Sequence, residues 1–515
     1  MHHKSIKLSG AIIFILICII AIATGVQAQK AVNSAPPMIP RTWDDEAMAS
    51  VELPLPQAGY SPVHVSSDFY YKIPVRPIYK TYPVYHPGKE PAGYLEWMKR
   101  QEPEQIKIDF PKFKSEQEWV KAGEIIFDAP IDYLNIEESH IRELALYEKT
   151  GTPVTKEGIM PFARYVVREK GKVELGIGAC SNCHTRVMED GTTIAGAQGN
   201  FPLDRVLGYG FRADAANAKD VKVFLEAARR VERGLYAASH LKGDPYARVD
   251  QMTIDEIASA HEEIPGGVFA RQRASAYYPP HVPDLIGIKD RRYLDATGLV
   301  RHRSVGDLMR YAALNQGGDD LSSYGDFRPV ESFREKMPEP SELGRYSDEQ
   351  LYALALYIYS LRPPTNPNRF DAQAARGQKI FNREGCAMCH TPPLYTNNKL
   401  LPAGGFIVPE AHKKEFDIFP MSAGTDPDLT LKTRRGTGYY KVPSLKGVWY
   451  RSMFEHNGSV ATLEDWFDPR RLQDDYVPTG FRGVGVKTRA VKGHEFGLDL
   501  SLEDRKALIR FLKTL

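Results

Sequence analysis

Two copies of a Cys-x-x-Cys-His motif carry most of the chemical information in this sequence. They are residues 180–184 (CSNCH) and 386–390 (CAMCH). The spacing is that of covalent c-type haem attachment, in which two thiols add to one porphyrin and the adjoining histidine binds its iron. We therefore predict two covalently bound haem c groups, with His184 and His390 as proximal iron ligands. The cysteines expected to hold the porphyrins are Cys180, Cys183, Cys386 and Cys389.

Other uses of paired cysteines fit this sequence less well. The two pairs of a zinc ribbon are usually about 15 to 20 residues apart, whereas these pairs lie in different thirds of the chain. A thioredoxin-like redox pair needs one motif and no trailing histidine. Disulfides between the pairs remain compatible with the chemistry, but they do not explain why a histidine follows both pairs.

The fifth cysteine, Cys18, lies in an apolar run near the N-terminus, residues 11–24. Two lysines precede the run, and a small-x-small sequence follows it. This order is typical of a secretory signal peptide, so we predict that residues 1–28 are removed and that the mature chain is periplasmic or secreted. An uncleaved membrane anchor is the alternative, but the run is shorter than the roughly 20 residues that cross a bilayer.

The bulk composition fits an ordinary globular protein. Of 515 residues, 42% are hydrophobic and 26% are charged, which argues against both a disordered chain and a polytopic membrane protein. There are 67 basic and 65 acidic residues, and two of the lysines, Lys4 and Lys7, lie in the expected signal peptide. The mature chain is thus near neutral, so we expect it to bind neither nucleic acid nor acidic lipid. Because the apolar run belongs to the expected signal peptide, we also expect no stable membrane span after cleavage.

Helical patterns around the two motifs indicate an internal repeat. In the second copy, residues 375–382 are amphipathic and precede the motif, and residues 501–515 have a capping-box start and apolar residues at helical spacing. In the first copy, residues 122–128 and 347–362 show the same two patterns. A haem motif between a first and a closing helix is the plan of a class I cytochrome c domain. The fold class predicted is therefore mostly α, with two such domains in tandem.

Proline-rich segments set the predicted domain boundaries. Pro363, Pro364 and Pro367 end the first closing helix and indicate a linker. Dense proline and tyrosine predict an N-terminal extension of little regular structure that wraps around the core, with a separate ligand-binding module as the alternative. The predicted parts are a signal peptide (1–28), the extension (29–114), a first cytochrome c domain with insertions (115–363), a linker (364–374) and a second cytochrome c domain (375–515).

Residues 115–515 resemble the bacterial di-haem cytochrome c peroxidase superfamily. That group includes the di-haem enzyme that matures methylamine dehydrogenase and the di-haem rubber oxygenase. The most specific part is residues 441–467 (KVPSLKGVWYRSMFEHNGSVATLEDWF), which resemble the family signature of V-P-x-L-[RK], F-x-H-[DN]-G-S and T-L-E. Residues 199–203 (GNFPL) resemble its Asn-x-Pro element.

The resemblance implies where the distal ligand of the second haem lies. The family places it between the signature and the final helix, often as methionine in peroxidases, but no methionine follows Met453 here. We predict that His494 takes this place opposite His390, which gives a bis-histidine haem similar to that of the rubber oxygenase. His456 or Met421 is the alternative ligand. Otherwise His456 is expected to contact a propionate or to organise the interdomain interface.

For the first haem, residues 282–317 resemble the family segment that approaches it. That segment usually carries a tryptophan thought to bridge the haems, but no tryptophan lies between the two motifs here, and Arg301, His302 and Arg303 stand in its place. We select His302 as distal ligand or catalytic residue, with an interfacial or propionate-side position as the alternative. The two arginines would pair propionates or form a solvated cluster. The histidines considered for the distal face are His240, His261, His281 and His302.

These features predict an exported di-haem c-type cytochrome that transfers electrons. The favoured reaction is that of an oxidoreductase of the cytochrome c peroxidase kind, which acts on peroxide at the first haem. The second haem then serves as relay to a small redox donor or acceptor protein. Oxygenase chemistry with dioxygen on an apolar substrate is the second possibility, and a non-enzymatic periplasmic electron carrier is the third. The resemblance further implies a calcium ion between the domains and a homodimer, but the sequence locates neither.

Overall fold

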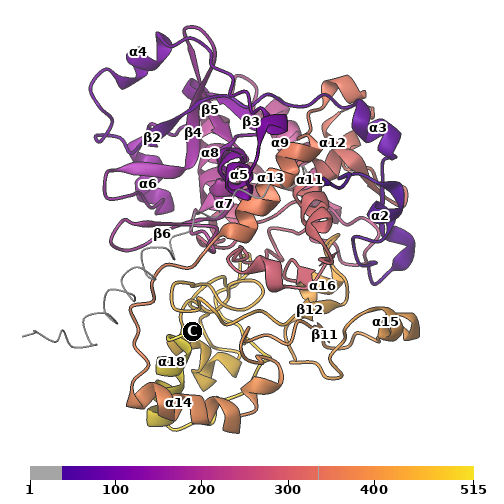
Figure 1. Ribbon diagram of the computed structural model, residues 1–515, viewed down its shortest axis with the longest axis vertical. Helices are drawn as coiled ribbons and strands as arrows, with labels where there is room; N and C mark the ends of the chain where they lie inside the picture. Colours follow the sequence, from indigo (N-terminus) through magenta and orange to yellow (C-terminus); the bar gives the residue numbers. More distant parts are fainter. Residues whose placement is uncertain (1–36, 335) are drawn as a thin grey trace, which may run out of the picture.

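The computed structural model describes residues 37–334 and 336–515 (Figure 1). The expected signal peptide, residues 1–28, lies outside these residues. Helices make up 38% of the structure and strands 12%, so helix predominates, but the fold is mixed α/β with small sheets. Figure 1 shows a larger first unit (residues 37–363) above a smaller second unit (residues 375–515).

The first unit is organised by two helices that cross at a glycine. Helix α5 (Glu116–Asp128) packs on α13 (Asp348–Ser360). A Cβ atom on Gly123 of α5 would lie 2.0 Å from the carbonyl oxygen of Ala353 on α13. Four residues beyond this glycine, Phe127 packs on Tyr357 with ring centroids 5.2 Å apart. The close approach of the two backbones therefore requires glycine at position 123.

The second unit repeats this crossing. Helix α14 (Ala372–Arg383) packs on α18 (Leu502–Leu512). A Cβ atom on Gly377 would lie 1.9 Å from the carbonyl oxygen of Ala507. Again four residues on, Phe381 packs on Phe511 at 5.4 Å. Both helix pairs coincide with the amphipathic segments expected from the sequence, and the two crossings are equivalent residue by residue.

The N-terminal extension is more regular than predicted. Its strand β2 (Thr81–Tyr85) joins an antiparallel sheet of order β2-β4-β5-β3, with Tyr82 opposite Tyr165 in β4. Upstream, Trp43 is completely buried, stacks on Tyr70 at 4.3 Å and donates a hydrogen bond from Nε1 to the carbonyl of Val65. The extension thus forms part of the first unit. The other strands of the sheet are β3 (Asp132–Asn135), β4 (Ile159–Glu169) and β5 (Lys172–Ile177).

The remaining elements of the first unit are insertions around this frame. The longer helices are α8 (Leu203–Asn217), α9 (Val221–Tyr236), α10 (Ile254–Glu262) and α11 (Val305–Leu321). The short helices are α2 (Asp45–Ala49), α3 (Ser67–Lys72), α4 (Tyr94–Lys99), α6 (Leu144–Thr150), α7 (Cys180–Cys183) and α12 (Val330–Phe333). The 3-10 helices are η1 (Ala58–Tyr60), η2 (Phe110–Lys112), η3 (Ile136–Glu138), η4 (Pro245–Gln251), η5 (Ile288–Asp290) and η6 (Pro340–Glu342).

Four two-stranded sheets complete the structure. Three belong to the first unit and one to the second, and all are antiparallel. The pairs are β1 (Pro62–His64) with β10 (Ser322–Tyr324), β6 (Thr185–Val187) with β7 (Thr193–Ala195), β8 (Tyr293–Leu294) with β9 (Val300–Arg301), and β11 (Leu400–Pro402) with β12 (Tyr439–Lys441). The short helices of the second unit are η7 (Cys386–Met388), α15 (Glu410–Glu415), α16 (Asp428–Leu431), α17 (Leu463–Trp466) and η8 (Pro469–Leu472).

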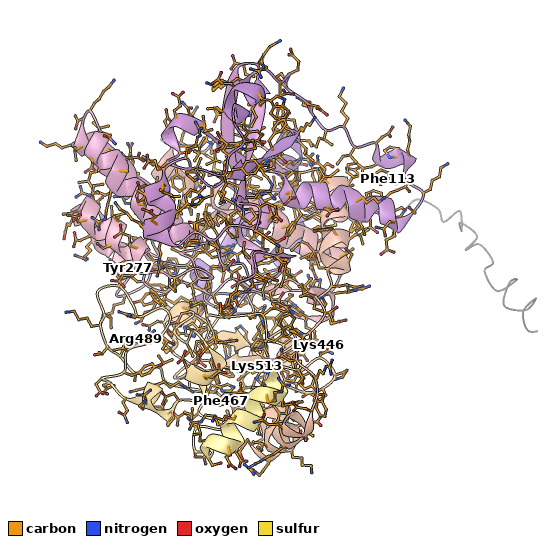
Figure 2. The ribbon with its side chains drawn as sticks, turned by 90° about the vertical axis from the view of Figure 1, so that its left-hand side faces the viewer. Phe113, Tyr277, Lys446, Phe467, Arg489 and Lys513 are labelled. Atoms are coloured by element: carbon orange, nitrogen blue, oxygen red, sulfur yellow. The ribbon has the colours of Figure 1, made fainter. Side chains whose placement is uncertain are left out.

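A buried arginine joins the two units. Arg434 of the second unit has no exposed surface, and its guanidinium donates hydrogen bonds to the carbonyls of Gly234, Leu235 and Ala237 at 2.7–2.9 Å. The same group forms an ion pair with Asp319 on α11. Figure 2 shows the side chains filling the region between the two units. Among the residues described, no helix combines the length and apolar character needed to span a membrane.

The glycine crossing gives a test of the fold. Replacing Gly377→Ala should lower the free energy of unfolding by about 1–3 kcal/mol, because the added methyl group overlaps the backbone of α18. The matched control is Gly210→Ala in α8, where a Cβ atom meets nothing within 4 Å. This control should raise the stability by about 0.5–1 kcal/mol, since glycine is a poor helix former. Denaturant unfolding measures both values, and equal effects would contradict the close crossing.

Candidate functional site

The first motif lies on α7, directly after the sheet, where its histidine is held by one hydrogen bond. His184 donates from Nδ1 to the carbonyl oxygen of Pro283 at 3.1 Å. With the proton on Nδ1, Nε2 keeps a free lone pair, which is the form that binds metals. Burial, assisted by the nearby charge of Arg271, lowers the pKa of His184 to about 3. This histidine is therefore a neutral imidazole near pH 7.

The second motif is held in the same way. His390 follows η7 and donates from Nδ1 to the carbonyls of Pro443 at 3.1 Å and Tyr395 at 3.2 Å. Burial, followed by the proximity of His494, lowers the pKa of His390 to about 4. Both motif histidines are thus neutral and present Nε2 away from a proline carbonyl.

The two prolines belong to a second internal repeat. We call residues 282–291 (VPDLIGIKDR) the first proximal loop and residues 442–451 (VPSLKGVWYR) the second proximal loop. Their final arginines fold back in the same manner. Arg291 donates to the carbonyls of Asp284 and Ile286, and Arg451 donates to those of Ser444 and Lys446. The shared V-P-x-L-x-G-x-x-x-R pattern is the sequence signal that identifies both loops, although this repeat was not among the predicted features.

A largely apolar cavity of about 240 Å³ opens beside the second motif. His390 and His494 both line it, and their ring centroids are 6.2 Å apart with an angle of 52° between the planes. The predicted pair is therefore brought together across the cavity. The other principal lining residues are Cys386, Cys389, Phe381, Trp466 and Phe496.

His494 is held firmly by its surroundings. Its backbone lies in the left-handed region at φ 49°, its N–H donates to the carbonyl of Ala423 at 2.6 Å, and its carbonyl accepts from Arg471 at 2.9 Å. The ring packs edge-on against Trp466 with centroids 5.0 Å apart. Its buried Nδ1 has no hydrogen-bond partner. A strained backbone and an unpaired ring nitrogen indicate a position kept for function.

The two alternative ligands also line this cavity. His456 stands against Tyr440 with ring centroids 4.7 Å apart, and its Nδ1 is 3.2 Å from a carboxylate oxygen of Glu455. Its backbone carbonyl accepts a hydrogen bond from the N–H of His281 at 2.8 Å, so the segment joins the two units. Met421 is 41% exposed at the edge of the cavity. His456 thus lies where the two units meet.

His302, selected from the sequence as distal ligand or catalytic residue, has both ring nitrogens hydrogen-bonded within the first unit. Its Nδ1 donates to the carbonyl of Arg291 at 2.7 Å, and its Nε2 accepts from the hydroxyl of Tyr359 at 2.6 Å. Neither ring nitrogen is left for a metal. The flanking arginines are also engaged, because Arg301 pairs with Glu415 and Arg303 with Asp307. The cluster holds the surrounding loops in place.

The other histidines between the motifs also have structural surroundings. His261 is buried between Asp204 at 2.7 Å and Glu232 at 3.0 Å, and the two carboxylates outweigh burial and raise its pKa to about 10. His281 donates from Nδ1 to the carbonyl of Glu455 at 2.7 Å. His240 stacks on a tyrosine ring at 4.5 Å.

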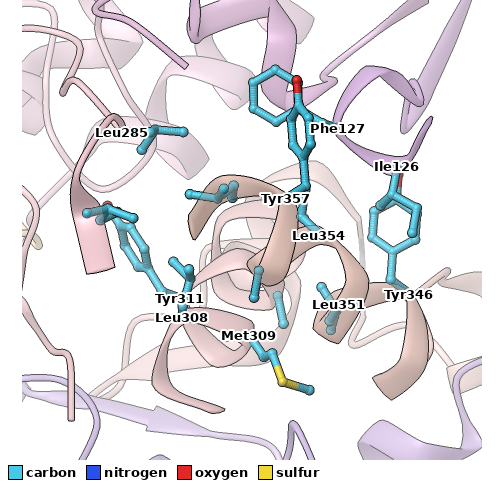
Figure 3. Packing of buried hydrophobic residues seen from close by; sticks show 14 of the residues in the cluster. Ile126, Phe127, Leu285, Leu308, Met309, Tyr311, Tyr346, Leu351, Leu354 and Tyr357 are labelled. Carbon is cyan, nitrogen blue, oxygen red and sulfur yellow. The ribbon is translucent and has the colours of Figure 1, made fainter. Parts of the chain in front are cut away.

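One charged group close to the first motif came from no sequence prediction. Arg271 is buried, its charge affects both His184 and Cys183, and it donates to the hydroxyl of Tyr311 at 3.0 Å and to Asp295 at 3.2 Å. Tyr311 is also part of an apolar cluster that includes Leu285, Leu308, Leu354 and Tyr357 (Figure 3). Cys180 packs against this cluster. No signal in the sequence pairs these residues, which come from distant segments.

The four motif cysteines are free and half-buried. Burial raises the pKa of Cys180 to about 12 and those of Cys183 and Cys386 to about 11, and it also raises that of Cys389. Such thiols lack the low pKa of a thioredoxin-like redox pair. In the described part of the chain, no three His, Cys, Asp or Glu side chains gather as a metal site of their own, and the expected calcium ligands stay unassigned.

Comparisons with known proteins give distant similarities. No protein-family model matches the chain. Cytochrome-c peroxidase IdrP1 of Pseudomonas sp. (strain SCT) is 25% identical over 166 residues, which are 29% of this chain and 41% of that protein. Uncharacterized protein y4iM of Sinorhizobium fredii (strain NBRC 101917 / NGR234) is 25% identical over 152 residues, 24% of this chain and 35% of that protein. The chain thus spans less than half the length of either relative.

Among solved structures, a chain from Kuenenia stuttgartiensis hydrazine synthase pressurised with 20 bar xenon is 16% identical. The match covers 56% of this chain and 87% of that chain, with a TM-score of 0.28. A score this low carries no argument about the fold. The class of protein therefore rests on the two motifs and the geometry around them, with the peroxidase similarity as support.

Proposed function

We propose that this protein is an exported di-haem cytochrome c that reduces peroxide. One observation carries the proposal: each Cys-x-x-Cys-His motif presents a neutral histidine, oriented by a proline carbonyl, at an equivalent place in two equivalent units. A haem c supplies an iron that changes oxidation state and binds small oxygen species when one axial face is open. The two units then act as tandem class I cytochrome c domains, and the extension braces the first.

The second centre fits a haem with two histidine ligands. When two imidazole rings bind the same metal, each through one nitrogen at about 2 Å, the two nitrogens are about 4 Å apart and the two ring centroids about 6 Å apart. The 6.2 Å between the rings of His390 and His494 agrees with this requirement. Phe381, Trp466 and Phe496 supply the apolar walls. Two strong protein ligands suit this centre to electron transfer.

Buried cations fit the acidic groups of the porphyrins. Arg291 and Arg451 each have a buried Nε atom with no partner, and both line a small cavity between the proximal loops together with Lys441. Burial and the charge of Arg291 lower the pKa of Lys441 to about 7. These residues take the propionate role that the sequence had given to Arg301 and Arg303, whose guanidinium groups are already paired.

The first centre is the site of reaction in this proposal. His261 and His302 have both ring nitrogens engaged, so they do not compete for the iron that His184 binds. Arg271 supplies a fixed positive charge near the motif, and Tyr311 supplies a hydroxyl beside it. The similarity to a cytochrome-c peroxidase supports peroxide as the substrate. A small redox protein would deliver electrons to the second centre.

Haem content tests the observation that carries the proposal. Protein produced with a cytochrome maturation system should contain two haems per chain in the alkaline pyridine haemochrome assay. Replacing Cys386 and Cys389 with Ala should remove one haem, and replacing Cys180 and Cys183 should remove the other. A colourless wild-type protein would overturn the proposal.

The ligand of the second centre can be tested by spectroscopy. The His494→Ala variant should convert one of the two haems from a low-spin to a high-spin ferric spectrum and shift its potential, because one axial ligand is lost. The His456→Ala variant is the matched control, since His456 lines the same cavity, and it should leave that spectrum unchanged. A change on His456→Ala alone would reassign the ligand.

Peroxide turnover tests the reaction itself. Hydrogen peroxide takes two electrons and two protons to give two waters, so the holoprotein should oxidise two molecules of a reduced small cytochrome per peroxide. The His184→Gly variant should lose this activity, and His302→Gln should keep it. Two low-spin irons that resist cyanide and consume no peroxide would indicate an electron carrier. Oxygen uptake with an apolar substrate would indicate an oxygenase.

A further inference from the structure

The two proximal loops touch each other through one buried hydrogen bond. Tyr450 of the second loop donates from its hydroxyl to a carboxylate oxygen of Asp284 in the first loop at 2.8 Å. Tyr450 is 2% exposed and Asp284 is 4% exposed. Burial, together with the Asp284 carboxylate, raises the pKa of Tyr450, so the hydroxyl keeps its proton.

This bond completes a continuous path between the motif histidines. Asp284 follows Pro283, whose carbonyl accepts the hydrogen bond of His184. On the other side, Tyr450 precedes Arg451, whose guanidinium donates to the carbonyl of Ser444 at 2.8 Å. Ser444 follows Pro443, the acceptor for His390. Covalent bonds and short hydrogen bonds therefore connect the two histidines without a gap.

Tyr450 also lies in the core of the other unit. It belongs to the apolar cluster around α5, α11 and α13. In the described part of the chain, the other buried members of that cluster all come from the first unit, at or before residue 361. Trp449 packs against the same cluster. An aromatic side chain from the second unit is thus fixed between the two centres, in a chain that has no tryptophan between its two motifs.

We propose that the Tyr450–Asp284 hydrogen bond is the electronic contact through which the second haem passes electrons to the first. The inference rests on the proposed function, because it requires a haem at each motif. His390 and His184 would hold the donor and acceptor haems, and one electron would pass from the former to the latter. No covalent bond forms or breaks, and the tyrosine proton stays between the two oxygens.

The test measures electron transfer between the haems in the holoprotein. After pulse reduction of one centre, the absorbance bands of the two haems report the rate of internal transfer. Tyr450→Phe removes the donor hydroxyl and keeps the ring, and Asp284→Leu removes the acceptor oxygens with a side chain of similar shape. Each should slow the transfer severalfold. The double variant should be no slower than the slower single variant, since both changes break the same bond.

The matched control is Tyr147→Phe. Tyr147 is buried in the first unit, away from the proximal loops, and its hydroxyl donates to the carbonyl of Ile141 at 3.0 Å. The control loses a buried tyrosine hydroxyl in the same way but should keep the wild-type rate. Haem content, measured on every variant, should stay at two per chain. The two midpoint potentials should keep their wild-type values in Tyr450→Phe and Tyr147→Phe, which carry no change of charge, so a slower rate in Tyr450→Phe reports a change in coupling and not in driving force.

The outcomes separate the two proposals. Variants that keep two haems, unchanged potentials and an unchanged rate would overturn the electronic role of Tyr450 and leave the di-haem function standing. An equal slowing in Tyr147→Phe would also overturn it, because any loss of packing would then suffice. A wild-type chain without haem would overturn the proposed function and this inference together.

Discussion

The hydrogen bond from each motif histidine to a proline carbonyl is the interaction on which the site depends. It fixes the ring, places the proton on Nδ1 and leaves Nε2 free. Both the orientation of the imidazole and the nitrogen available to a metal are therefore defined. It also ties the motif to its proximal loop, where Arg291 or Arg451 closes the turn. The loops in turn meet at the interface, so the orientation of each imidazole and the contact between the units depend on the same residues.

The two units share a plan but differ where chemistry requires it. Both have the glycine crossing and the proximal loop. Among the described residues, a histidine faces the motif histidine across the cavity in the second unit, whereas the environment of the first motif contains Arg271 and Tyr311 beside an apolar cluster. In the proposed function, this difference separates an electron-transfer centre from a reaction centre.

Local patterns in the sequence predicted the two motifs and the helices around them, and long-range contacts account for what was missed. The motifs and the four amphipathic helices are encoded within short segments, and the structure has helices at those places. The sheet around β4 and β5 was missed because it lies in an insertion that a cytochrome plan does not include. The hydrogen bonds of His302 to Arg291 and Tyr359 could not be predicted, because these partners lie elsewhere in the chain and helical periodicity carries no information about them. The pairing of His494 with His390 came from the resemblance, and the geometry agrees with it.

The burial of Arg434 has a mechanical consequence. A guanidinium that donates to three main-chain carbonyls of the opposite unit cannot leave without exposing unsatisfied groups on both sides. A swing of the units about the proline-rich linker would break these hydrogen bonds. We therefore expect the two units to stay joined even after a cut in that linker, with the distance between the two motifs set by this contact.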